Sequence, residues 1–121
     1  MKLYDTNLLI YFFQPDYDFL QADLLDTNVF VSAITKLEVL GFPSISEPEK
    51  AYFERLFQLI NILPVDESVI EEAINLRQRR KMSIGDSIIA ATAKVKNLDI
   101  YTRNTSDFKW ITGLRVVDPM V

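Results

Sequence analysis

The chain of 121 residues contains no cysteine and no histidine. It therefore cannot form disulfide bonds, use a thiol nucleophile or a serine–histidine triad, or hold zinc through the usual nitrogen and sulfur ligands. Acid–base chemistry would have to come from carboxylates, lysine, tyrosine or metal-bound water. The metal expected with such residues is a hard cation bound through oxygen, Mg²⁺ or Mn²⁺.

Long apolar runs are also missing, because none reaches the roughly 18 residues needed to cross a bilayer. The start of the chain lacks a basic segment followed by an apolar core and a cleavage site. We therefore expect no membrane association and a cytoplasmic location. The length suits one domain, and 49% hydrophobic residues can fill its core, so residues 1–121 are predicted to form a single domain.

Short apolar segments alternate with longer amphipathic ones along the whole chain. The expected strands are Lys2–Tyr4, Val29–Ser32, Ile62–Val65, Leu98–Tyr101 and Leu114–Asp118. The expected helices are Leu8–Phe13, Tyr17–Leu25, Ala33–Leu40, one that resumes after Pro48, one capped by Asp66, and one that starts near Ser83–Asp86. This alternation predicts an α/β sandwich with a mostly parallel sheet.

The tripeptide Asp-Thr-Asn occurs twice, at residues 5–7 and 26–28. In open parallel sheets, ligands bind at the carboxyl ends of the strands, where the strand order reverses. Asp5 follows an expected strand, whereas Asp26 precedes one and should lie at the opposite edge. The first copy is therefore the candidate for chemistry, and the second is expected to form a turn through Thr27 or Asn28.

Three further acids can reach the same edge, namely Glu38, Asp86 and Asp107. Taken singly, each has an ordinary structural explanation as a solvated helix acid, a loop acid or an acid stabilised by a helix dipole. Gathered together, four carboxylates would repel one another unless a cation neutralised them. A pair of divalent ions at such a site can activate water and stabilise the leaving oxygen of a phosphodiester.

Four motifs in this order give the chain a specific resemblance: "DTN" after an opening strand, "VSAITKLEVLG", "GDSIIAATA" and "YTRNTSDF". Over nearly its whole length, the chain resembles PIN-domain ribonucleases, in particular the VapC-type toxins of toxin–antitoxin pairs. The resemblance implies a three-layer sandwich with a mostly parallel five-stranded sheet flanked by helices. It also implies Mg²⁺- or Mn²⁺-dependent cleavage of RNA, a homodimer, and a cognate antitoxin that covers the site.

The resemblance also assigns roles to particular residues. The family's acidic quartet, which binds metal and carries catalysis, corresponds to Asp5, Glu38, Asp86 and Asp107. The polar residues that support it correspond to Thr6, Asn7, Ser32, Thr35, Thr102 and Asn104.

Basic residues close to the expected site are candidates for RNA contact. They are Arg77, Arg79, Arg80 and Lys81 in "RQRRK", together with Arg103. The alternative for the first group is a helix C-terminus that basic side chains stabilise through the helix dipole. The net charge of −4 opposes a broad RNA-binding surface, but setting aside the four proposed ligands leaves 13 acidic against 13 basic residues.

Most aromatic residues are expected in the core. Some could instead form a surface for a second subunit or an antitoxin helix, the candidates being Tyr11, Phe12, Phe13, Phe42, Tyr52 and Phe53.

Three other functions compete with the nuclease. A receiver-type signalling domain would need an acidic pair after the first strand and a lysine after the last, but Thr6 and Asn7 follow Asp5, and "TRN" offers Arg103 in place of the lysine. An aspartyl-nucleophile phosphatase would need a second aspartate where Asn7 stands. A non-catalytic PIN scaffold is the third alternative, and the intact acidic quartet argues against it.

Overall fold

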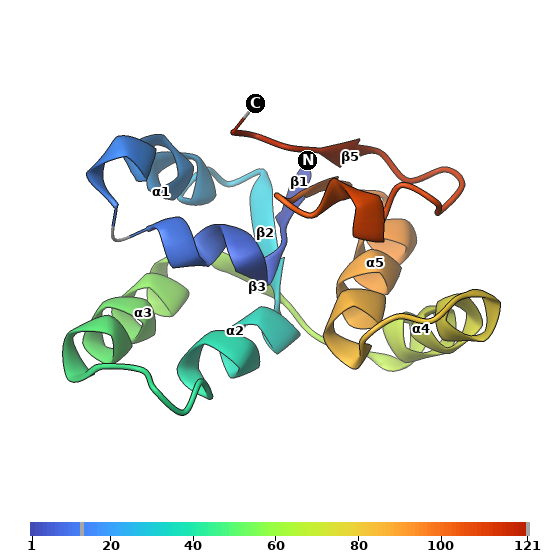
Figure 1. Ribbon diagram of the computed structural model, residues 1–121, viewed down its shortest axis with the longest axis horizontal. Coiled ribbons are helices and arrows are strands. Elements are labelled where there is room, and N and C mark those ends of the chain that lie inside the picture. Colours follow the sequence, from blue (N-terminus) through green and yellow to red (C-terminus); the bar gives the residue numbers. More distant parts are fainter. Residues whose placement is uncertain (13, 121) are drawn as a thin grey trace.

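The computed structural model describes residues 1–12 and 14–120, which form a parallel sheet covered by helices on both faces (Figure 1). The strands are β1 Lys2–Tyr4, β2 Val29–Ser32, β3 Asn61–Leu63, β4 Asp99–Tyr101 and β5 Val116–Val117. They run in the order β3-β2-β1-β4-β5, and every pairing is parallel. The predicted α/β sandwich with a five-stranded sheet is therefore confirmed.

The helices are α1 Asp18–Leu24, α2 Ala33–Leu40, α3 Glu47–Leu59, α4 Glu67–Arg79 and α5 Ile84–Lys96, with 3₁₀ turns η1 Thr6–Tyr11, η2 Pro15–Tyr17 and η3 Thr105–Asp107. On one face of the sheet, Leu3 and Ile100 pack against α4 and α5. On the other face, Tyr4 and Val31 pack against η1, α1 and α3. Each face thus buries its own apolar cluster, which gives the three layers.

Side-chain caps fix where the long helices begin. Ser46 and Glu49 form a reciprocal capping box at the start of α3. Asp66 accepts a hydrogen bond from the Val69 amide at the start of α4, as the sequence predicts. Ser83 accepts one from the Asp86 amide, which places Asp86 in the first turn of α5.

Local differences from the predicted elements have simple causes. The predicted helix Leu8–Phe13 is a 3₁₀ turn that begins earlier, because the Leu8 amide already bonds the Asp5 carbonyl; Phe13 lies outside the described residues. The predicted helix Tyr17–Leu25 is divided into η2 and α1. Strand β3 ends before Pro64, which has no amide hydrogen to donate, and β5 is shorter than predicted.

The second Asp-Thr-Asn forms a turn at the opposite edge of the sheet from Asp5, as predicted. The Asp26 carboxylate accepts a 2.8 Å hydrogen bond from the Asn28 amide just before β2. The turn-forming side chain is thus that of Asp26 itself, whereas the sequence suggested Thr27 or Asn28.

None of the helices in the described part of the chain combines the length and the apolar character that crossing a bilayer requires.

Candidate active site

Asp5 lies where the direction of strand addition reverses. The chain builds β2 and β3 on one side of β1 and then adds β4 on the other, so the switch point falls between β1 and β4. At this point the Asp5 amide donates to the Tyr101 carbonyl over 2.9 Å. Asp5 is 4% exposed, and its carboxylate accepts a 2.8 Å hydrogen bond from the Thr102 hydroxyl.

Thr102 is the centre of a small polar network. Its hydroxyl is fully buried and receives hydrogen bonds from the side-chain amide of Asn7 at 3.3 Å and from the backbone amide of Asn104 at 3.0 Å. The hydroxyl hydrogen is therefore directed towards Asp5. Three of the polar residues assigned by resemblance thus act together to hold one carboxylate oxygen.

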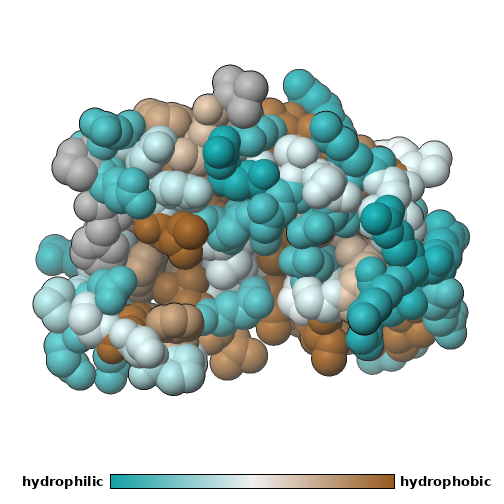
Figure 2. All heavy atoms as spheres, in the orientation of Figure 1, coloured by the Kyte–Doolittle hydropathy of each residue, from teal (hydrophilic) through white to brown (hydrophobic). Residues whose placement is uncertain are grey.

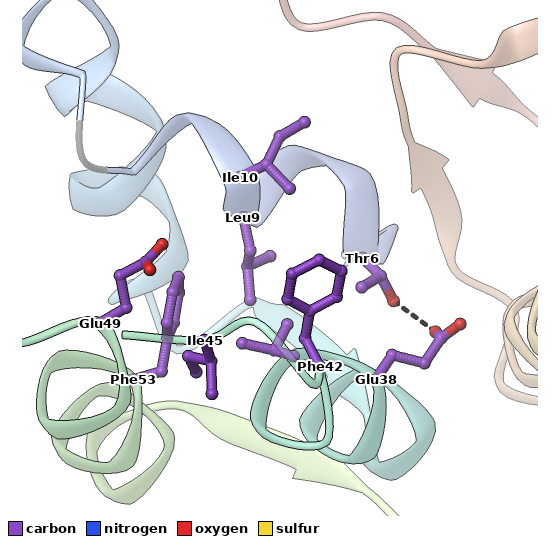
Figure 3. Close-up of a pocket in the computed structure, with 9 residues that line it drawn as sticks. Thr6, Leu9, Ile10, Glu38, Phe42, Ile45, Glu49 and Phe53 are labelled. Atoms are coloured by element: carbon purple, nitrogen blue, oxygen red, sulfur yellow. Dashed lines mark hydrogen bonds between the residues drawn. The ribbon is translucent and has the colours of Figure 1, made fainter. Parts of the chain in front are cut away.

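Glu38 is held by a second network. The Thr6 hydroxyl donates to the Glu38 carboxylate over 2.8 Å (Figure 3). The same hydroxyl lies 2.9 Å from the Thr35 hydroxyl. Because a hydroxyl has one hydrogen, Thr35 must donate to Thr6. On its other side, the Glu38 carboxylate packs on the backbone of Gly85, where an added Cβ would lie 2.7 Å from Oε2.

Asp86 and Asp107 lie next to each other in a neighbouring cavity. Asp86 projects from the first turn of α5, and Asp107 ends η3, which follows β4. Both line a cavity of about 370 Å³ together with Arg80, Lys81, Met82, Ser83 and Trp110. Segments far apart in the sequence thus bring these two acids together.

The four carboxylates influence one another electrostatically. Burial raises the pKa of Asp5 to about 6; the hydrogen bond from Thr102 opposes the shift, while the charges of Asp86 and Glu38 add to it. The pKa of Asp86 is also raised, first by burial and then by the charges of Asp107 and Glu38, against the hydrogen bond from Ser83. The acids therefore form a region of concentrated negative charge.

The chemistry of these donors fits a divalent cation. All of them are oxygen atoms, and a cation would relieve both the repulsion and the cost of burying the charged form of Asp5. Within residues 1–12 and 14–120, however, no three acidic side chains stand close enough to form a complete metal site. Binding would require the carboxylate groups to move closer together, and the exposed side chain of Asp107 has room to do so.

The other predicted residues are Ser32 and the basic side chains, and only two of these basic side chains line the cavity beside Asp86 and Asp107. Ser32 is buried and caps α2, accepting from the Ile34 amide. Arg80 and Lys81 lie in the cavity beside Asp86 and Asp107. Arg77 donates to the Met82 carbonyl, whereas Arg103 pairs with Asp118 at 3.0 Å. Arg79 lies in the last, exposed turn of α4 and does not line the cavity.

Trp110 also lines this cavity, although it was not among the predicted site residues. Its indole N–H donates to the Asp107 carbonyl over 3.0 Å, and the Arg80 guanidinium lies 5.4 Å from its ring centre. The available signal was its position three residues after Asp107 in "SDFKW".

An apolar groove begins at Glu38 and runs between η1, α2 and α3. The surface there is hollowed and rich in hydrophobic residues (Figure 2), and its volume is about 290 Å³. Figure 3 shows Phe42 in the middle, Thr6 and Glu38 at one end, and Glu49 and Phe53 at the other. The aromatic residues predicted as a possible binding surface differ in exposure. Phe42 is 58% exposed, Phe12 and Phe53 are buried, and Tyr11 and Tyr52 are partly buried. Phe13 lies outside the described residues.

A family model described as PIN domain matches residues 2–113. The chain belongs to the PIN domain family. The family predicted from the four motifs is therefore confirmed. None of the curated proteins compared with this PIN domain matches it.

Solved structures with the same fold include several toxin–antitoxin assemblies. A chain in a toxin–antitoxin complex from Klebsiella pneumoniae is 32% identical over 98% of both chains, with a TM-score of 0.80. A chain of FitAcB from Neisseria gonorrhoeae is 29% identical over 99% of both, with a TM-score of 0.77. A chain of DNA-bound VapBC from Salmonella typhimurium shares the fold of this PIN domain, with 23% identity, a TM-score of 0.82, and coverage of 97% of this chain and 96% of that one.

Proposed function

We propose that this PIN domain is a metal-dependent endoribonuclease toxin that hydrolyses RNA phosphodiester bonds. The observation that carries the proposal is Asp5, a buried carboxylate at the switch point of the sheet whose pKa is raised by burial and by neighbouring acids. A structural acid gains nothing from such surroundings, whereas a metal ligand is stabilised once a cation arrives.

Asp5, Glu38, Asp86 and Asp107 would hold Mg²⁺ or Mn²⁺. The bound ion would supply positive charge that makes an attacking water more acidic and stabilises the charge developing on the phosphodiester. The chain's own contribution is to hold the carboxylates in place. Thr102 restrains Asp5, and Thr6, with Thr35 behind it, restrains Glu38.

Cleavage of labelled RNA tests this function directly. We expect hydrolysis with Mn²⁺ or Mg²⁺, none with EDTA, and none by Asp5→Asn. The matched control is Asp26→Asn, which alters the same tripeptide at the opposite edge, where an asparagine oxygen can still accept from the Asn28 amide. Phosphate attached to Asp5 in place of RNA cleavage would favour a receiver or phosphatase chemistry, and a folded protein that cuts no RNA would favour a non-catalytic scaffold.

A cognate antitoxin is the proposed inhibitor, and the apolar groove is its proposed docking site. The complex from Klebsiella pneumoniae joins a toxin to an antitoxin, and its similar chain covers nearly all of this one. The groove presents Ile10 and Phe42, exposed by 66% and 58%, and ends at Glu38. An amphipathic helix with apolar residues towards Phe42 and a basic residue towards Glu38 would therefore bind here and block the acids.

A homodimer is the proposed assembly. Ile70 and Ile74 on α4 and Ile84 on α5 are exposed by 38%, 45% and 61% and line one groove between the two helices. Such a surface can face an identical copy across a two-fold axis. We expect Ile74→Glu to convert a dimer to a monomer in light scattering, and an unchanged mass would remove this surface from consideration. The cytoplasmic location expected from the sequence remains a prediction.

A further inference from the structure

The cavity beside Asp86 and Asp107 differs from the apolar groove in its lining. Arg80 and Lys81 place two cations in it, and Trp110 adds a flat aromatic ring. Its volume of about 370 Å³ is within the range of small-molecule sites. Two of the acids proposed to hold metal, Asp86 and Asp107, therefore line the same cavity as two basic side chains that can attract phosphate.

Trp110 is held in place on two sides. Its indole N–H bonds the Asp107 carbonyl, which fixes the ring relative to one of the four acids. The Arg80 guanidinium lies over the ring at 5.4 Å from its centre, so a cation and an aromatic ring lie side by side in the cavity. A ring that only filled the core would be buried, but Trp110 remains partly exposed.

Unpaired nucleotides are recognised by this combination of groups. Bases stack on aromatic rings and on arginine planes, and lysine and arginine bind the backbone phosphates. A paired base cannot present its face in this way, because its neighbours in the duplex already cover it.

We propose that the Arg80–Lys81–Trp110 cavity is a nucleotide subsite that holds one unpaired residue of the RNA next to the bond that is cut. Trp110 stacks on the base, and Arg80 and Lys81 bind the adjoining phosphate. These residues position the substrate and take no part in bond breaking. The assignment rests on the proposed ribonuclease function, and it predicts that the enzyme selects single-stranded or loop segments of RNA.

Trp110 is the only tryptophan in the chain, so its fluorescence reports directly on this cavity. The first experiment titrates Asp5→Asn, which should not cleave, with a short single-stranded RNA and with the same RNA annealed to its complement. We expect the single strand to quench the fluorescence and the duplex to do so far less. No quenching by the single strand, or equal quenching by both, would overturn the subsite.

Cleavage kinetics of the otherwise unaltered enzyme give the second readout. We expect Trp110→Leu to raise KM about 10-fold with kcat nearly unchanged, and Trp110→Phe to restore most of the loss, because stacking needs only a ring. Arg80→Ala should raise KM and make it less sensitive to salt, whereas Arg79→Ala, its neighbour outside the cavity, should not. Equal effects of the two arginine substitutions would contradict the inference.

The two proposals fail in different ways. If RNA is cleaved and the Trp110 and Arg80 variants have the same KM as the wild type, the ribonuclease function stands and the subsite is excluded. Quenching by single-stranded RNA without any cleavage by the wild-type protein would show that the cavity binds an unpaired nucleotide but would overturn the ribonuclease function. If there is neither cleavage nor quenching, both proposals are excluded.

Discussion

The hydroxyl of Thr102 donates a 2.8 Å hydrogen bond to the carboxylate of Asp5, although 97 positions separate the two residues in the sequence. The bond joins the ends of β1 and β4, the two strands on either side of the switch point. It stabilises the charged form of an acid whose burial favours the neutral form. Thr102 is thus the principal neutral group that favours the charged form of Asp5, the form that the proposed metal ligation requires.

Replacing Thr102 by valine tests this role with little change in side-chain shape. The loss of the hydroxyl should raise the pKa of Asp5 further and weaken metal binding, so that RNA cleavage at limiting Mn²⁺ falls about 10- to 100-fold. Raising the Mn²⁺ concentration or the pH should recover part of the activity. Thr112→Val, on the exposed loop before β5, is the control, and equal activity of the two variants would contradict the role given to Thr102.

The raised pKa of Asp5 predicts how stability depends on pH in the absence of metal. The folded protein keeps a proton on Asp5 up to about pH 6, whereas the unfolded chain loses it near the ordinary value of 3.8. The folded state is therefore favoured below that value, and this contribution is lost as the pH rises through about 6. Asp5→Asn removes the effect and should stabilise the metal-free protein at neutral pH by up to about 3 kcal/mol, but not below pH 4.

Urea unfolding at several pH values measures this difference. Saturating Mg²⁺ should abolish the advantage of Asp5→Asn at neutral pH, because the ion binds the folded wild type and stabilises it. A stability difference that is independent of both pH and Mg²⁺ would show that Asp5 carries no such electrostatic cost.

Replacing Gly85 by alanine should lower the activity without lowering the stability of the fold. An alanine there would bring its Cβ within 2.7 Å of the Glu38 carboxylate, and the end of that exposed side chain can swing away. In a helix, Gly→Ala stabilises by up to about 1 kcal/mol, so the variant should melt no lower than the wild type. Displacing Glu38 should nevertheless reduce cleavage roughly 10-fold or more. Unchanged kcat/KM in a folded Gly85→Ala protein would exclude Glu38 from the site.

A substitution at Phe42 tests whether the apolar groove binds the antitoxin. Phe42→Glu should leave cleavage nearly unchanged and weaken inhibition by a cognate antitoxin, because it places a charge in the centre of an apolar surface. Leu37→Glu, which alters an exposed residue of α2 outside the groove, is the matched control. Inhibition that is equally strong for both variants would place the antitoxin elsewhere.

Local sequence signals were sufficient for much of this architecture. Asp5 could be separated from Asp26 because one follows a strand and the other precedes one. Asp66 was recognisable as a helix cap, and "GDSIIAATA" indicated that Asp86 lies in the first turn of α5. Such inferences need only the residues adjacent in the sequence.

Other features depend on the order of the strands, which no local pattern encodes. The bond from Thr102 to Asp5 exists because β4 pairs with β1, and the contact of Glu38 with Gly85 depends on how α2 meets α5. Trp110 cannot be assigned to the site from its neighbours in the sequence, because an aromatic residue is most often part of the core. Its partial exposure beside Arg80 emerges only in the folded chain.

Diffraction at the manganese absorption edge from crystals soaked in Mn²⁺ would show whether the four carboxylates bind divalent ions. We expect an anomalous peak at the carboxyl end of β1, with the Asp5 carboxylate and others of the acids Glu38, Asp86 and Asp107 bound to the ion. Crystals in which those carboxylates stay apart, with no manganese between them, would contradict it.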